Sequence, residues 1–346
     1  YAPAAVALVV AASAVLAAVL LLFQDPLAQL FFGSSRYADL ITPMPLLVLG
    51  GALHGIAYGY LRGRSRIQRA NILIGFNHAV VPLLAIPLSG GSVARILLWM
   101  GGLWVASSLA FLVFAPLALD GVPKRVGELA RFGVPRIPGD LLRLGLFSFP
   151  SLAVAHVADI ATAGSVAFGV AAVGMLGTAL SPIGFVMLPV SARMMAAGEI
   201  AELRRRVVTI TALTATFLLV GVGVVELLAP QLVAIYLGGG FGATATAVRV
   251  IAPAALPWGV YMSLASVVDA HHVRPVNARN MAVAFAVFAA GAGVMALFHL
   301  PSLAIAGAFV VSLYVLGVLT VLEVSSITSR ERDVVLPLAP ESQPLV

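Results

Sequence analysis

The chain has 346 residues, of which 61% are hydrophobic and 10% charged, and its mean hydropathy is +1.07. About a quarter of the residues of a soluble domain are charged, so 20 basic and 14 acidic residues are too few to cover a water-exposed surface at this length. The net charge of +6 indicates membrane topology and contact with anionic lipid rather than nucleic acid, and the absence of cysteine excludes disulfides, thiolate metal sites and cysteine nucleophiles.

Apolar runs of the length of a transmembrane helix follow one another along the whole chain. A hydrocarbon core about 30 Å thick needs about 20 residues of helix to cross it. Ten such runs occur, at 1–23, 43–61, 71–88, 96–118, 138–157, 164–189, 207–228, 246–268, 280–297 and 303–325. They predict an all-α, polytopic membrane protein with four helices in an N-terminal bundle, 1–118, and six in a C-terminal bundle, 138–325.

The start of the chain, the segment between the two bundles and the C-terminal segment each lead to a prediction of their own. The chain opens with Tyr1 directly inside an apolar run, without a basic region or a cleavage motif, so we expect a spanning helix with upstream sequence removed rather than a signal peptide. Residues 119–137 carry apolar residues at helical spacing between basic ones, which predicts a helix lying on the inner leaflet; a plain connector is the alternative. The polar residues 326–346 predict a poorly ordered tail.

The basic residues gather in alternate loops. Sixteen of the 20 lie in one set of loops and at the C-terminal end: Arg62, Arg64, Arg66, Arg69, Lys124, Arg125, Arg131, Arg136, Arg193, Arg204, Arg205, Arg206, Arg274, Arg279, Arg330 and Arg332. The other loops contain only Arg36 and Arg95. Cytoplasmic loops carry the excess of Lys and Arg, so the pattern predicts a cytoplasmic-membrane protein with both chain ends in the cytoplasm.

Two stretches repeat one another in outline. LLFQDPLAQLFFG, with Pro26, leads through an apolar run to a basic loop that ends at Asn71, and ELLAPQLVAIYLGGG, with Pro230, leads in the same way to Asn280. The first run therefore corresponds to the seventh and the second to the eighth. A repeat unit of six helices predicts two further helices before Tyr1.

Two segments resemble a known transporter family. ELARFGVPRIPGDLLRLGLFSFPSLAVAHVADIATAGSVAFG, from Glu128 to Gly169, resembles the entry into the seventh and eighth helices of the polysaccharide flippases of the multidrug/oligosaccharidyl-lipid/polysaccharide exporter superfamily. LSPIGFVMLPVSARMMAAGE, from Leu180 to Glu199, resembles the exit from their eighth helix. The resemblance implies two six-helix lobes around a central cavity, which move a polyprenyl-pyrophosphate-linked oligosaccharide to the outer leaflet by alternating access. It implies that lipid-linked oligosaccharide, membrane lipid and other polysaccharide assembly proteins are partners, without a cofactor.

Polar residues inside apolar runs are candidate substrate-binding residues because burying a charge in a bilayer costs about 2.5 to 3.5 kcal/mol on insertion scales. Arg143 suits a pyrophosphate, since guanidinium pairs donors with charge, and its alternative is an ion pair with Asp140 three residues earlier. Arg249 lies just inside the end of the eighth run. It is a second candidate, with extension to the interface as the alternative.

His54 and His78 lie near the middle of the second and third runs. A proton-binding role and a hydrogen bond between helices are both open for them. Asn71 lies seven residues before His78, which predicts a shared polar face that binds substrate. His156 and Asp159, one turn apart after Pro150 at the end of the fifth run, are candidate gating residues, with an ordinary interfacial pair as the alternative.

The remaining signals concern packing and the rival functions. Gly50–Gly51 and Gly101–Gly102 are expected to allow close helix approach, and Trp99, Trp104 and Trp258 to pack or anchor. Enzyme motifs such as HExxH, a Walker loop and GxSxG are absent from the sequence, so we expect a transporter without a metal or a catalytic site. A cation-coupled multidrug exporter would require a carboxylate in mid-membrane. A polysaccharide polymerase or ligase would require a large outer loop with Arg and His.

Overall fold

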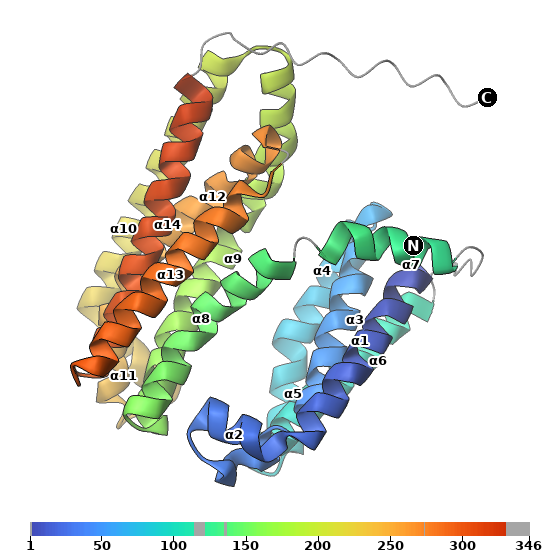
Figure 1. Ribbon diagram of the computed structural model, residues 1–346, viewed down its shortest axis with the longest axis vertical. Coiled ribbons are helices and arrows are strands. Elements are labelled where there is room, and N and C mark those ends of the chain that lie inside the picture. Colours follow the sequence, from blue (N-terminus) through green and yellow to red (C-terminus); the bar gives the residue numbers. More distant parts are fainter. Residues whose placement is uncertain (1, 114–121, 135–136, 273, 330–346) are drawn as a thin grey trace. The chain divides into compact units, whose positions relative to one another are not determined.

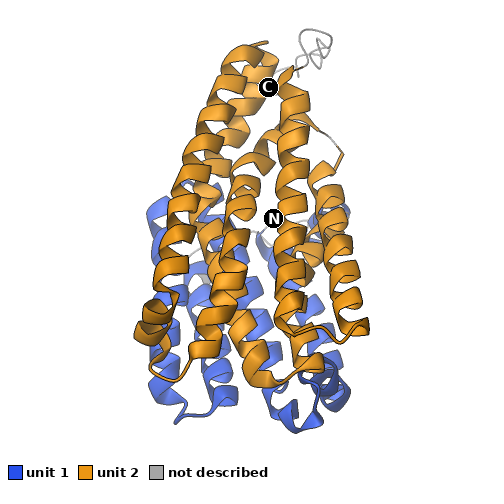
Figure 2. Cartoon of the chain, turned by 90° about the vertical axis from the view of Figure 1, so that its left-hand side faces the viewer, with its two compact units in different colours: residues 1–135 blue, residues 136–346 orange. Residues whose placement is uncertain are grey.

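The computed structural model describes residues 2–113, 122–134, 137–272 and 274–329 (Figure 1). Within these ranges ten helices are long and apolar enough to cross a membrane, and no strand is present. This confirms the predicted all-α, polytopic membrane protein. The chain divides into two compact units, residues 1–135 and 136–346, which Figure 2 shows in different colours.

Unit 1 is built around helix α3. Its elements are α1 (Ala2–Leu22), α2 (Gln24–Phe32), the 3-10 helix η1 (Ser35–Leu40), α3 (Met44–Gly63), α4 (Ile67–Gly75), the π-helix η2 (Phe76–Val80), α5 (Val81–Leu88), α6 (Val93–Val113) and α7 (Val122–Gly133). Helix α3 packs against α1, α4 and α6, and a small core forms around Ala57, Leu61 and Leu73. Helix α7, in the segment expected to join the two bundles, packs on α1.

Unit 2 is built around helix α12. Its elements are α8 (Ile137–Val157), α9 (Ile160–Ala196), α10 (Ile200–Leu237), α11 (Gly242–Ile251), the 3-10 helix η4 (Ala252–Ala254), α12 (Ala255–His271), α13 (Val276–Leu297) and α14 (Leu303–Ser329). Helices α9, α10 and α14 surround α12, and the largest core cluster includes Trp258, Phe309 and Leu146. Helix α12 is therefore the most enclosed span in unit 2.

Several helices extend beyond the predicted apolar runs. Helix α9 has 37 residues and α10 has 38, about 55 Å each at 1.5 Å per residue, which exceeds a hydrocarbon core of about 30 Å. A tight turn joins them, in which Gly198 has φ 73, a left-handed conformation that glycine adopts without strain. Helix α14 continues to Ser329, so the first four residues of the expected tail are helical. The rest of that tail lies outside the described residues.

Glycines allow α3 and α6 to approach closely. A Cβ added at Gly101 would lie 2.6 Å from the backbone nitrogen of Leu47, and one added at Gly50 would lie 2.8 Å from the carbonyl oxygen of Gly101. At Gly102, by contrast, an added Cβ would meet only the tip of Leu46, at 3.8 Å. The expected close approach is confirmed for one glycine of each pair.

Four spans of each unit share four packing pairs when α4, η2 and α5 are counted as the one span Ile67–Leu88. In unit 1 the pairs are α1 with α3, α3 with α4, α3 with α6, and α5 with α6. In unit 2 they are α10 with α12, α12 with α13, α12 with α14, and α13 with α14. The helices that correspond follow one another along the chain in the order that the sequence repeat predicts. The two units therefore resemble each other in helix packing as well as in the outline of their sequences.

Candidate functional site

A polar cluster lies within the apolar helices of unit 1, where three elements meet. Its members are His54 on α3, Asn77 and His78 on the π-helix η2, and Trp104 and Ser107 on α6. Polar side chains are costly in an apolar helix bundle and persist where they find partners or serve a function. The cluster is therefore the first candidate site.

A proline leaves one carbonyl of the π-helical turn without a backbone donor. The backbone N–H of Val81 donates to the carbonyl of Phe76, five residues earlier, instead of to Asn77. In this wider register the next donor to Asn77 would be the N–H of Pro82, which proline lacks. The indole Nε1 of Trp104 donates to the Asn77 carbonyl instead, at 2.8 Å. A side chain of α6 thus satisfies a backbone oxygen that the helix leaves without a donor.

The side chain of Asn77 is fully buried and connects two other helices. Its Oδ1 accepts a hydrogen bond from the Ser107 hydroxyl at 2.6 Å, which directs its Nδ2 towards His54 Nδ1 at 2.8 Å. An amide nitrogen only donates, so His54 Nδ1 accepts and carries no proton. The network therefore selects the neutral His54 tautomer with its hydrogen on Nε2.

Aromatic rings complete the cluster. The ring centroid of His54 lies 5.1 Å from that of His78 and 6.2 Å from that of Trp104, and the His78 and Trp104 centroids are 5.5 Å apart. His78 is exposed, and its Nδ1–H donates to the carbonyl of Ile74 at 3.1 Å. Its Nε2 is then the acceptor nitrogen. Together the groups can bind a proton or donate and accept hydrogen bonds with a polar solute.

Asn71 lies outside this cluster. It is exposed near the start of α4, and the π-helical turn begins between it and His78. A π-helical turn holds more residues than an α-helical turn, so the seven-residue spacing no longer gives the alignment of a regular α-helix. The structure brings His54 and His78 together, and within the described residues neither forms a hydrogen bond or a ring contact with Asn71.

Arg143 lies near the start of α8 and pairs with Asp140. The Nη2 and Oδ1 atoms are 3.6 Å apart, and the two side chains are 49% and 68% exposed. A pair this exposed contributes little to stability. The guanidinium thus remains accessible to a ligand while its charge has a local partner.

Arg249 on α11 has a backbone partner. Its Nε donates to the carbonyl of Glu226 on α10 at 2.9 Å. Within α10 that carbonyl would accept from residue 230, which is Pro230 and has no N–H. As at Asn77, a side chain from another helix donates to a carbonyl that a proline leaves without a backbone donor. This contact gives Arg249 a structural role.

Asp159, a candidate gating residue, caps a helix. Its carboxylate accepts from the backbone N–H groups of Ala161 and Thr162 at 2.8 and 2.9 Å, and from the Thr162 hydroxyl at 2.7 Å. These hydrogen bonds, those of Thr162 foremost, lower the pKa of the Asp159 carboxyl from its ordinary value. His156 lies in the last turn of α8, on the other side of the turn that joins α8 to α9.

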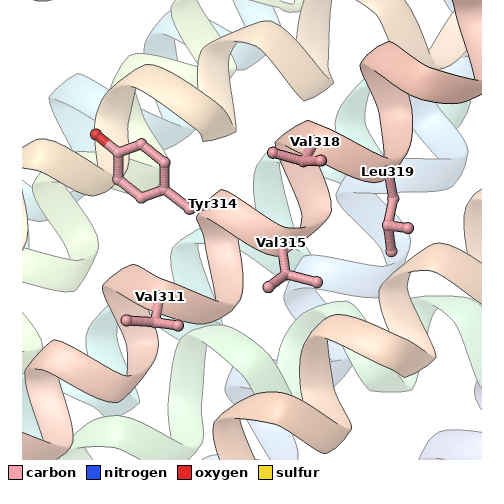
Figure 3. Close-up of a pocket in the computed structure, with 5 residues that line it drawn as sticks. All are labelled: Val311, Tyr314, Val315, Val318 and Leu319. Carbon is pink, nitrogen blue, oxygen red and sulfur yellow. The ribbon is translucent and has the colours of Figure 1, made fainter.

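Two hollows lie in unit 2. One of about 310 Å³ is lined by apolar residues and Tyr314, all on α14: Val311, Tyr314, Val315, Val318 and Leu319 (Figure 3). Such a lining suits contact with lipid. The other is a groove of about 540 Å³ between α10 and α14, whose lining combines Val207, Leu264 and Val321 with Arg204 and several Ser and Thr residues. It offers apolar surface and a cation together.

Comparison of the chain with protein-family models, with curated proteins and with solved structures gave no match. The fold and the site therefore define the protein as a polytopic helical membrane protein with a polar cluster among its spans.

Sequence reasoning missed three members of the cluster. Asn77, Trp104 and Ser107 lie in apolar runs, and Trp104 was expected only to pack or anchor. The available signal was the Asn77–His78 pair in mid-span followed by Pro82, five residues after Asn77. Among the described residues no group of three or more His, Cys, Asp or Glu side chains is arranged to hold a metal ion.

Proposed function

We propose that the chain is a transporter that moves a polyprenyl-pyrophosphate-linked oligosaccharide across the membrane for surface polysaccharide synthesis. The repeated packing of four helices in each unit is the observation that carries the transporter class. Many membrane transporters are built from such structural repeats, and one repeat rocks against the other to give alternating access. The predicted orientation puts the basic loops in the cytoplasm.

The substrate class rests on the sequence resemblance from Glu128 to Gly169 and from Leu180 to Glu199. Two features of unit 2 are compatible with an anionic amphiphile. The accessible guanidinium of Arg143 offers paired donors to a phosphate, and the groove between α10 and α14 joins apolar surface to Arg204.

Translocation in sealed vesicles tests the proposal. Purified chain is reconstituted with a fluorescent polyprenyl-pyrophosphate oligosaccharide, and an impermeant quencher added outside measures the fraction of probe in the outer leaflet with time. We expect the probe to cross faster than in protein-free vesicles, while a fluorescent phospholipid of the same acyl length does not. Equal rates for the oligosaccharide probe with and without protein would reject the function.

The same vesicles separate the rival functions. Uptake of a cationic dye without movement of the lipid-linked probe would favour the multidrug exporter. Growth of the glycan on the lipid would favour a polymerase or ligase.

A further inference from the structure

We propose that His54 is a proton-binding site whose protonation reverses the hydrogen bonds of Asn77 and Ser107. The inference deepens the proposed function, on which it rests for the role of the proton as the coupling ion. The binding of the proton itself depends only on the cluster in unit 1.

When His54 is neutral, each donor in the chain of hydrogen bonds points from α6 towards α3. The Ser107 hydroxyl donates to Asn77 Oδ1 at 2.6 Å, and Asn77 Nδ2 donates to His54 Nδ1 at 2.8 Å. His54 holds its one ring hydrogen on Nε2. Each of the two contacts therefore joins one donor to one acceptor.

A proton taken up from water adds to His54 Nδ1 and makes two donors face each other across 2.8 Å. The clash is removed when the Asn77 amide turns over, so that Oδ1 accepts from the new Nδ1–H and Nδ2 donates to the Ser107 oxygen. The Ser107 hydroxyl then donates to the Trp104 carbonyl, which is already 3.1 Å away. No bond other than the new N–H forms, and release of the proton restores the first arrangement.

The hydrogen bond from Trp104 to the backbone of Asn77 is kept while the side chains change between donor and acceptor. Trp104 Nε1 donates to the Asn77 carbonyl in both states, because neither atom takes part in the reversal. The change is therefore confined to the side-chain hydrogen bonds that His54 on α3, Asn77 on η2 and Ser107 on α6 make with one another. Such a two-state element is what an ion must bias in order to drive a conformational change.

The ionisable groups around His54 are histidine, tyrosine and arginine side chains. His78 lies 5.1 Å from His54 between ring centroids. Tyr58, Tyr60 and Arg62 lie on α3 itself, and the Tyr58 ring is stacked on that of His54 at 6.1 Å between ring centroids. Arg69 and Arg95 lie near the starts of α4 and α6. Helix α1 contributes no ionisable group, so no acidic partner from these elements holds the proton.

Ring-nitrogen NMR of the purified full chain in micelles tests the site without any substrate. With ¹⁵N-labelled histidine, we expect His54, assigned by its loss in His54→Gln, to show only the Nε2–H tautomer at high pH. It should become doubly protonated as the pH is lowered. A neutral Nδ1–H tautomer, or an absence of titration, would overturn the proposal.

Adjacent serines supply a matched pair of variants. Ser107→Ala removes the hydroxyl that orients Asn77, so neutral His54 should populate both tautomers. Ser108→Ala removes a buried hydroxyl that has no hydrogen-bond partner among the described residues, and it should leave the His54 signals unchanged. Equal spectra for the two variants would show that Ser107 does not direct the network, and would overturn the mechanism.

A transport arm links the proton to the proposed function. A pH gradient across the vesicles should accelerate movement of the lipid-linked probe by the wild-type chain and leave the rate of His54→Gln unchanged. If His54 titrates as described but the probe does not move at all, the proposed function fails and the proton site stands. If the probe moves with the same gradient dependence in His54→Gln, the coupling role fails.

Discussion

The approach of α3 to α6 determines how the two halves of the polar cluster meet, and Gly101→Ala is the change that tests it. A Cβ at this position would lie 2.6, 2.7 and 2.9 Å from backbone atoms of Leu47 and Leu46. Backbone atoms cannot rotate away as a side-chain tip can. Helix α3 would have to move by about 0.8 Å, the difference between 2.6 Å and the 3.4 Å at which ordinary contact begins.

Two terms set the expected loss of stability. Insertion of a methyl into a tightly packed contact costs about 1 to 3 kcal/mol. The better helix propensity of alanine returns about 0.5 to 1 kcal/mol. Gly102→Ala gains the same helix propensity but has almost no steric cost, because its Cβ would meet only Leu46 Cδ2 at 3.8 Å. The difference between the two variants, about 1 to 3 kcal/mol, therefore isolates the steric cost.

The assay is equilibrium unfolding by SDS in mixed micelles, followed by tryptophan fluorescence. Trp99 and Trp104 lie on α6 and report on unit 1. We expect a lower midpoint for Gly101→Ala, and a midpoint equal to or slightly above that of the wild type for Gly102→Ala. Equal midpoints for the two variants would refute the argument that the glycine at 101 holds the helices together.

Three further changes test the structural roles of the candidate residues. Arg249→Ala should lower the free energy of unfolding in SDS by about 1 kcal/mol, because the Glu226 carbonyl loses its donor, and an unchanged free energy of unfolding would contradict that role. The cap by the Asp159 carboxylate should be present above the ordinary carboxyl pKa and lost as pH falls through its lowered pKa. The protection of the amides in the first turn of α9, corrected for the intrinsic pH dependence of exchange, should therefore fall in acid for the wild type but not for Asp159→Asn. If Arg143 binds pyrophosphate, Arg143→Ala and the double variant with Asp140→Ala should both lose translocation, whereas recovery in the double variant would leave only the ion pair.

The sequence was sufficient for the fold class because lipid imposes a simple rule. A helix that crosses a bilayer needs about 20 apolar residues, and the described residues of all ten predicted runs are helical except for turns at Phe23 and Pro43. The ends of α9 and α10 could not be found in this way. Hydropathy marks where the chain meets lipid, while their backbone hydrogen bonds continue through Arg193 and Arg204 until Gly198 turns the chain.

The two histidines of the polar cluster could be predicted from the sequence, but their partners could not. His54 and His78 are unusual residues for mid-span positions, so composition alone singles them out. Their partners depend on tertiary geometry: an indole and a serine on α6 reach the carbonyl and the side chain of Asn77. No periodicity encodes these contacts, because they join residues 27 and 30 positions apart in the chain.

The central claim is that the chain crosses the membrane ten times with its basic loops on one side, and cysteine accessibility tests it most directly. The sequence contains no cysteine, so each introduced thiol is unique. In intact cells that carry the chain in their plasma membrane, an impermeant maleimide should label Ser35→Cys and Gly239→Cys. It should label Ser65→Cys and Ala201→Cys only after the membrane is opened. All four positions are exposed, so labelling reports the side of the membrane. Labelling of Ser35→Cys and Ser65→Cys from the same side of the membrane would contradict the account.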